Sequence, residues 1–243
     1  MKFLRTLTEL TAFLEQHRLE LGCLADTSFL YALSYQDDRL YSRANDVSDI
    51  LAETNIPIYT NVIGRVEFID LIFRKQITFG AIELFATLST NSTHRDVYNL
   101  LKNIRDQDTA HRRDCQSFKI SEGRLKDLRT AIENAVGPLN WRQFCGQYAG
   151  SKLFSEWQII EQELGLNFIE ILEGQVAPFF KEPVTWSDMV QVMSDQGIRA
   201  PDAMIANLFA KSKFKLLVTG DKDFEACFSN SLHTQEDQAI LFL

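Results

Sequence analysis

The sequence is poor in cysteine, and its cysteines suit neither a disulfide framework nor a zinc site. The four are Cys23, Cys115, Cys145 and Cys227. No two of them are close enough in sequence to form a Cys-x-x-Cys type pair. We therefore expect reduced thiols, as in proteins of the cytosol.

Long apolar runs are also missing. No segment approaches the roughly 18 uninterrupted apolar residues of a membrane-spanning helix. A signal peptide needs an apolar region near the start, and here charged or titratable residues interrupt it: Arg5, Glu9, Glu15, His17, Arg18 and Glu20. These absences predict a soluble, cytoplasmic protein with no membrane partner.

An excess of basic residues is absent as well, because the formal net charge is -8 at pH 7. Such a chain does not attach to nucleic acid or to anionic membranes through its whole surface. The chain also contains neither G-x-G-x-x-G nor G-x-x-x-x-G-K, which disfavours dinucleotide and nucleoside-triphosphate binding. What it does have is 243 residues of which 45% are hydrophobic, enough for a substantial core.

Short apolar strands alternate with helices along both ends of the chain. Strands are predicted at 19–25, 56–60, 214–218 and 238–243. Helices are predicted at 3–14, from Asp26 to about Tyr35, at 39–54, from about Asn61 through Ile72, at 185–197 and at 201–210. The connections between strands are too long for hairpins, so the pattern indicates an α/β fold with a central parallel sheet.

The middle of the chain has a helical composition and no repeat. Within it, residues 94–129 hold nine Lys and Arg against six Asp and Glu, whereas residues 130–200 hold four against nine. The basic part includes Arg112 and Arg113, which are candidate RNA-binding residues. A solvated helix face is the ordinary explanation of such a charge pattern.

Four carboxylates follow or begin these predicted elements. Asp26 and Asp221 stand at strand ends, Glu67 lies on a helix after a strand, and Asp202 lies in the first turn of a helix. Each has an ordinary reading on its own, as a helix cap, a turn residue or a surface residue. Together they are expected to meet at the carboxyl edge of the sheet, where ligands of open α/β sheets bind. Four such groups without basic partners repel one another, and this predicts a bound Mg²⁺ or Mn²⁺.

The same segments, in the same order, resemble the PIN-domain nucleases, especially the VapC-like toxin ribonucleases. The resemblance lies in Leu24-Ala25-Asp26-Thr27-Ser28-Phe29-Leu30, in Tyr59-Thr60-Asn61 leading to Glu67, in Pro201-Asp202-Ala203-Met204-Ile205-Ala206, and in Val218-Thr219-Gly220-Asp221-Lys222-Asp223-Phe224. It implies a three-layer α/β/α fold and metal-dependent cleavage of RNA. It covers about residues 19–75 and 198–243, and leaves 76–197 as a large helical insertion within a single domain, 1–243.

By this resemblance, Asp26, Glu67, Asp202 and Asp221 are the catalytic residues and bind the Mg²⁺ or Mn²⁺. Asp223 joins the metal-binding set, and Thr27, Ser28 and Thr219 are auxiliary groups. RNA is the implied substrate, and an inhibitory antitoxin protein and a second copy of the chain are the implied protein partners.

Two other functions compete with a metal-dependent endoribonuclease. One is a catalytically silent PIN-like scaffold that binds a protein partner through the helical insertion. The other is a metal-dependent phosphatase of the haloacid dehalogenase type, which also places an Asp after its first strand. That class expects a second Asp two residues later, where this chain has Ser28.

Overall fold

The computed structural model of the chain describes residues 1–88, 95–114, 116–135, 140–170, 174, 176, 178–230 and 236–243. The chain divides into two compact units. Unit 1 consists of Met1–Ser34, Leu40–Phe68 and Ile160–Leu243, and unit 2 of Tyr35–Arg39 and Ile69–Ile159. Two helices, α4 (Val62–Thr87) and α8 (Ser151–Glu163), contribute residues to both.

Unit 1 is built on a six-stranded sheet in which every pair of neighbours is parallel. Its strands are β1 (Lys2–Leu4), β2 (Cys23–Ala25), β3 (Ile58–Asn61), β4 (Asn167–Ile169), β5 (Leu216–Thr219) and β6 (Ala239–Phe242). Their order across the sheet is β1-β6-β5-β2-β3-β4. The α/β class with a central parallel sheet, predicted from the sequence, is confirmed.

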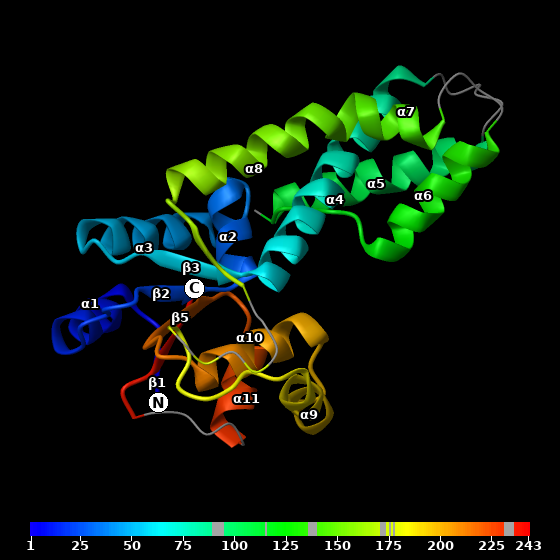
Figure 1. Cartoon of the computed structure of the whole chain (residues 1–243). Helices are drawn as coiled ribbons and strands as arrows, with labels where there is room; N and C mark the ends of the chain where they lie inside the picture. The colour runs from blue at the N-terminus through cyan, green and yellow to red at the C-terminus, as the bar shows by residue number, and fades with distance from the viewer. Residues whose placement is uncertain are drawn as a thin grey trace. The chain divides into compact units, whose positions relative to one another are not determined.

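Helices cover this sheet on both sides (Figure 1). Those of unit 1 are α1 (Leu7–Gln16), α2 (Thr27–Ser34), α3 (Tyr41–Glu53), the start of α4, α9 (Trp186–Gln196), α10 (Ala200–Lys211) and α11 (Asp223–Asn230). Figure 1 shows α2 and α3 on one side, and α10 and α11 on the other. The helices predicted at 39–54, 185–197 and 201–210 are confirmed as α3, α9 and α10.

Two strands differ from the sequence-based assignment. Phe3 and Leu4, which helical spacing assigns to the first helix, instead belong to β1 and pair with β6. The helix begins only at Leu7, after its N-cap residue Thr6. The other difference is β4, a strand that lies within the predicted helical insertion and pairs with β3. Because of this pairing, residues 160–197 belong to unit 1, whereas the sequence places the end of the insertion at 197.

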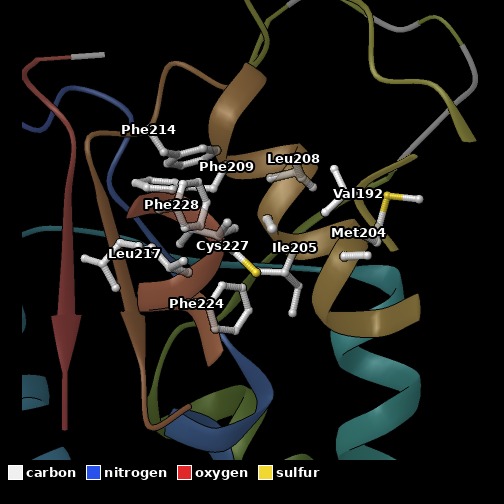
Figure 2. Packing of buried hydrophobic residues seen from close by; sticks show 14 of the residues in the cluster. Val192, Met204, Ile205, Leu208, Phe209, Phe214, Leu217, Phe224, Cys227 and Phe228 are labelled. Carbon is white, nitrogen blue, oxygen red and sulfur yellow. The ribbon is translucent and has the colours of Figure 1, made fainter. Parts of the chain in front are cut away.

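The core of unit 1 lies between the sheet and α9–α11. Figure 2 shows side chains of α10 and α11 packed against one another and against β5. Its largest buried members include Phe209, Phe214 and Phe224, all at most 1% exposed. The buried amide of Gln238 donates hydrogen bonds to the carbonyl oxygens of Phe209 (2.9 Å) and Phe214 (3.0 Å), which ties the end of α10 to the approach of β5. These contacts hold α10 and β5 in fixed positions relative to each other.

Unit 2 is helical. Besides the remainder of α4 and most of α8, it contains α5 (Arg95–Arg113), α6 (Glu122–Asn134), α7 (Trp141–Cys145) and the π-helical turn η1 (Gly146–Gly150). These helices enclose a core of their own that includes Leu101, Ile104 and Phe144, each fully buried. The helical composition predicted for this part of the chain is therefore confirmed.

Among the described cysteines, Cys23, Cys145 and Cys227 are free thiols, as expected; Cys115 lies outside the described residues. None of the helices in the described ranges is both long and apolar enough to cross a bilayer.

Within unit 2, a buried lysine of α4 binds the loop between α2 and α3. The Lys75 side chain is fully buried, and its ammonium group donates to the carboxylate of Asp37 (3.1 Å) and to the hydroxyl of Ser117 (2.7 Å). The same ammonium lies over the rings of Tyr35 and Phe79, 5.4 and 4.9 Å from their centroids. A buried charge of this kind is stabilised only while its partners remain.

We expect Asp37→Ala to lower the free energy of unfolding by about 1–3 kcal/mol, because the Lys75 ammonium then loses its charged acceptor. The measurement is urea denaturation of the parent and the variant. Asp46→Ala, which removes an exposed acid from α3, is the control and is expected to change little. In a Lys75→Met background the Asp37→Ala effect should shrink, because the two residues are coupled. Equal losses in both backgrounds would contradict the role given to this pair.

Candidate functional site

The order of the strands creates one switch point in the sheet. From β2 the chain passes to β3 and β4 on one side, and it later returns to β5 and β6 on the other, where β6 pairs with β1 from the start of the chain. The connections on either side of β2 and β5 therefore diverge, and ligands of open α/β sheets bind at the carboxyl ends of the strands at such a point. Asp26 directly follows β2, and Gly220 and Asp221 directly follow β5.

Asp26 is held rigidly at this point. Its backbone amide donates to the carbonyl of Val218 on β5 (3.0 Å), and its side chain is 4% exposed. One carboxylate oxygen, Oδ2, accepts hydrogen bonds from the hydroxyls of Ser28 (2.6 Å) and Thr219 (2.9 Å). Burial raises the pKa of Asp26, and these hydrogen bonds, together with those from the backbone amides of Thr27 and Ser28, oppose that rise.

The turn after β5 is organised by the same two hydroxyls. The Gly220 amide donates to Ser28 Oγ (2.7 Å), and the Asp221 amide donates to Thr219 Oγ1 (2.9 Å). Asp221 in turn accepts a hydrogen bond from the amide of Asp223 (2.8 Å), which begins α11. Asp221 is half-buried, whereas Asp223 is exposed. Asp223 thus contributes its backbone to the turn, and its carboxylate faces solvent.

Glu67 comes from the second turn of α4. Its Oε2 accepts a hydrogen bond from the hydroxyl of Thr27 (3.0 Å). Glu67 is half-buried, and its neighbour Val66 is 63% exposed.

Two further residues, the last of β3 and the third of α4, position the helix that carries Glu67. Asn61 Oδ1 accepts the Gly64 amide (2.7 Å) and so caps the helix that carries Glu67. Gly64 is needed for space, since a Cβ there would lie 2.8 Å from Thr60 Oγ1. The available signal was an Asn at the end of a predicted strand followed by a Gly three residues later, which is the spacing of a helix cap.

Asp202 completes the group from the first turn of α10. Its pKa is raised from 3.8 to about 7, first by burial and then by the negative charges of Asp26, Glu67 and Asp221, while Arg199 acts in the opposite direction. Four carboxylates from four separate segments therefore lie within electrostatic range of one another. The structure brings together Asp26, Thr27, Ser28, Glu67, Asp202, Thr219 and Asp221.

The donor chemistry of this carboxylate group suits a hard divalent cation, because it offers several anionic oxygens and neither His nor Cys. Its geometry is not that of a ready-made site: within the ranges the structure describes, no three His, Cys, Asp or Glu side chains are arranged to hold a metal ion. Mutual repulsion keeps carboxylates apart when no cation lies between them. The residues thus fit Mg²⁺ or Mn²⁺ in charge and donor type, and ligation would require them to approach one another.

Searches with the sequence and the structure find no matching protein-family model, no matching curated protein and no matching solved structure. What the site does is therefore inferred from its own residues.

The two candidate RNA-binding residues belong to a different unit from the carboxylates. Arg112 and Arg113 end α5 in unit 2. Arg112 Nε donates to Asp108 Oδ2 (2.6 Å), and Asp108 is 5% exposed. Arg112 therefore neutralises a buried acid, whereas Arg113 is exposed and has no ion pair within the described part of the chain.

We expect Mn²⁺ or Mg²⁺ to raise the melting temperature, because a ligand that binds only the folded state stabilises it by mass action. At 100 times the Kd the gain is about 2.7 kcal/mol, or roughly 5–10 °C for a chain of this size. The double variant Asp26→Asn, Glu67→Gln should lose this shift, and Asp46→Asn should keep it. The measurement is thermal denaturation with each ion and with chelator. If the ions raise the melting temperature of the double variant as much as that of the parent, they bind at another site.

Without metal, Asp202→Asn should stabilise the protein in a pH-dependent way. Because the folded-state pKa of Asp202 is raised to about 7, ionised Asp202 opposes folding; this penalty is absent below pH 4, grows up to about pH 7 and is then constant. The variant and the parent should therefore melt alike near pH 4, and the variant should melt higher at pH 8. Melting curves in chelator across this pH range give the measurement. A difference that does not vary with pH would show that Asp202 does not feel the other carboxylates.

Proposed function

We propose that the chain is a PIN-like, metal-dependent endoribonuclease that hydrolyses RNA phosphodiester bonds, as VapC-like toxins do. The observation that carries this proposal is the gathering of Asp26, Glu67, Asp202 and Asp221 at the switch point of a parallel sheet, where burial and then the charges of the other three raise the pKa of Asp202. A protein gains nothing in stability from such repulsion, and a bound cation would remove it.

The proposed ligands of the cation are the four carboxylates of that group. Asp223, which the resemblance also includes, is a weaker candidate because its carboxylate is exposed. When bound at such a site, Mg²⁺ or Mn²⁺ lowers the pKa of water and stabilises negative charge on phosphate oxygens. No side-chain nucleophile is required for this chemistry.

The hydroxyls around the carboxylates act by orienting them. Ser28 and Thr219 both bind Asp26 Oδ2, and Thr27 binds Glu67 Oε2, so two of the four proposed ligands have fixed orientations. Hydrogen bonds to acceptor oxygens of this kind favour the ionised carboxylate, which is the form that binds a cation. The sequence resemblance assigns the same three hydroxyls auxiliary roles.

The fold adds a second kind of support. In the order Asp26 after β2, Glu67 after β3, Asp202 before β5 and Asp221 after β5, the acids follow the arrangement that the PIN resemblance implies. Ser28 stands two residues after Asp26, where a haloacid dehalogenase-type phosphatase would need a second carboxylate. Here its hydroxyl donates a hydrogen bond to Asp26, which disfavours the phosphatase alternative.

We expect Asp26→Asn or Asp221→Asn to abolish cleavage, with a loss of at least a hundredfold, while the protein remains folded. The assay incubates parent and variants with labelled RNA and DNA in Mg²⁺, in Mn²⁺ and in chelator, and circular dichroism checks the fold. Asp46→Asn serves as the matched control. Cleavage by an Asp26→Asn variant at the parental rate would remove that residue from the site. A folded parent that cuts nothing with either ion would favour the silent scaffold that binds a protein partner.

The basic end of α5 allows a separate prediction about RNA affinity. Arg113→Ala should weaken RNA binding and lower the dependence of log K on log salt by about 0.7, the value for one contact with a single-stranded phosphate. Arg112 is unsuitable for this test because its loss would leave Asp108 without its charged partner. Binding is measured across a salt series in an Asp26→Asn background, with Arg129→Ala on α6 as the control. If log K depends on log salt equally in all three proteins, Arg113 makes no contact with an RNA phosphate, and α5 has only a structural role.

A further inference from the structure

A pocket of about 600 Å³, here called the amino-end pocket, lies in unit 1 at the amino ends of β2 and β3. The end of α1 and the turn before β2 line one side of it, and the end of α3 and the segment before β3 line the other. Its volume falls within the range of small-molecule sites, roughly 300–1,000 Å³. The carboxylate group is at the carboxyl ends of the strands, so this pocket is a separate site.

The backbone shapes both sides of the amino-end pocket. Gly22 has a φ of 104°, and a Cβ at this residue would lie 2.1 Å from the carbonyl oxygen of Pro57. A glycine is therefore needed for the turn before β2 to pack against the segment before β3. Asn55, with a φ of 55°, turns the chain from α3 toward β3 in the left-handed conformation that Asn tolerates. The pocket is thus already formed in the free chain.

Apolar side chains form part of the pocket wall. Leu14 and Leu19 come from the α1 side, and Ile50 and Ile56 come from the α3 side. All four are half-buried, so each keeps some apolar surface in contact with water. Covering such surface is favourable, and a ligand that fits here therefore has an apolar part.

Two helices end at the pocket and give it a negative potential. The carboxyl end of a helix carries a partial negative charge, because its last carbonyl groups lack partners within the helix. Neither α1 nor α3, both of which are fully described, has a basic residue in its last turn to offset this charge. At the end of α1 the His17 amide donates to the carbonyl of Phe13 (2.9 Å), whereas the carbonyl of Leu14 accepts no hydrogen bond from a described residue. A ligand with N–H donors would supply one.

The charged side chains of the lining add to this potential. Glu15 and Glu20 are acidic, Arg18 is basic, and all three are exposed. The ion pairs found among the described residues include none of the three. Two carboxylates and two helix ends together outweigh one guanidinium, so the pocket attracts cations.

We propose that the amino-end pocket binds an organic cation of the polyamine class. Its terminal ammonium groups, each with three N–H donors, bind the carboxylates of Glu15 and Glu20 and the carbonyl end of α1. Its methylene stem covers the half-buried leucine and isoleucine side chains of the wall. This site does not depend on the proposed ribonuclease function, whose residues lie at the opposite ends of the strands.

The test measures spermidine binding by isothermal titration calorimetry, in chelator, for the parent and three double variants. The pocket variant is Glu15→Gln, Glu20→Gln. The charge-matched control is Asp46→Asn, Asp49→Asn, which changes two exposed acids of α3 outside the lining. The carboxylate variant is Asp26→Asn, Glu67→Gln.

We expect the pocket variant to bind spermidine about tenfold more weakly than the parent, because it loses two charged acceptors, and the other two variants to bind like the parent. Spermidine should also raise the melting temperature of the parent more than that of the pocket variant. Melting curves without spermidine check that all four proteins are folded.

Three results would overturn this inference. If the charge-matched control loses as much affinity as the pocket variant, spermidine responds to net charge alone. If the carboxylate variant loses the binding instead, spermidine binds at the carboxylates and the pocket is not its site. A parent that binds no spermidine at millimolar concentration would also contradict the proposal. None of these results bears on the ribonuclease function, which RNA cleavage tests separately.

Discussion

Repulsion between carboxylates at one edge of a parallel sheet is the constraint on which the rest of the site depends. Asp26, Glu67, Asp202 and Asp221 come from four separate segments, and burial together with the charges of the other three raises the pKa of Asp202 to about 7. Such an arrangement persists only if the surrounding structure supports it. Here the support comes from hydroxyls that bind the acids and from a core that fixes the helices and strands carrying them. Figure 2 shows part of that core, with α10 and α11 packed through Phe209, Phe224 and Phe228.

The same small set of contacts links the fold to the site. Ser28 binds both Asp26 and the Gly220 amide, so one side chain joins the start of α2 to the turn after β5. Thr219 does the same for Asp26 and Asp221. The two strand ends at the switch point are thereby fixed to each other by side chains as well as by the β2–β5 pairing. Orientation of this kind is what a metal or phosphate site requires of its ligands.

Most of unit 1 could be predicted from the sequence, because its strands are short apolar runs and its helices have clear caps and apolar spacing. The failures have local causes. Phe3 and Leu4 fit helical spacing as well as strand alternation, and only pairing with β6 decides between them. The strand β4 has just three residues, of which two are half-buried, so it carries little periodic signal. The acids could be proposed as a group because of their places next to strands and helix starts. Asn61 and Gly64, which set the start of α4, act through a backbone hydrogen bond and through lack of space, and these leave little signal in the sequence.

The central claim is that the four carboxylates form one divalent-cation site, and a crystal structure of the parent grown with Mn²⁺ tests it most directly. The account predicts an anomalous scattering peak at the carboxyl ends of β2 and β5. At least three of Asp26, Glu67, Asp202 and Asp221 should lie about 2.0–2.2 Å from it, the range of a small hard cation and its oxygen ligands. A well-ordered crystal with Mn²⁺ bound elsewhere, or with these carboxylates still apart at saturating Mn²⁺, would contradict the account.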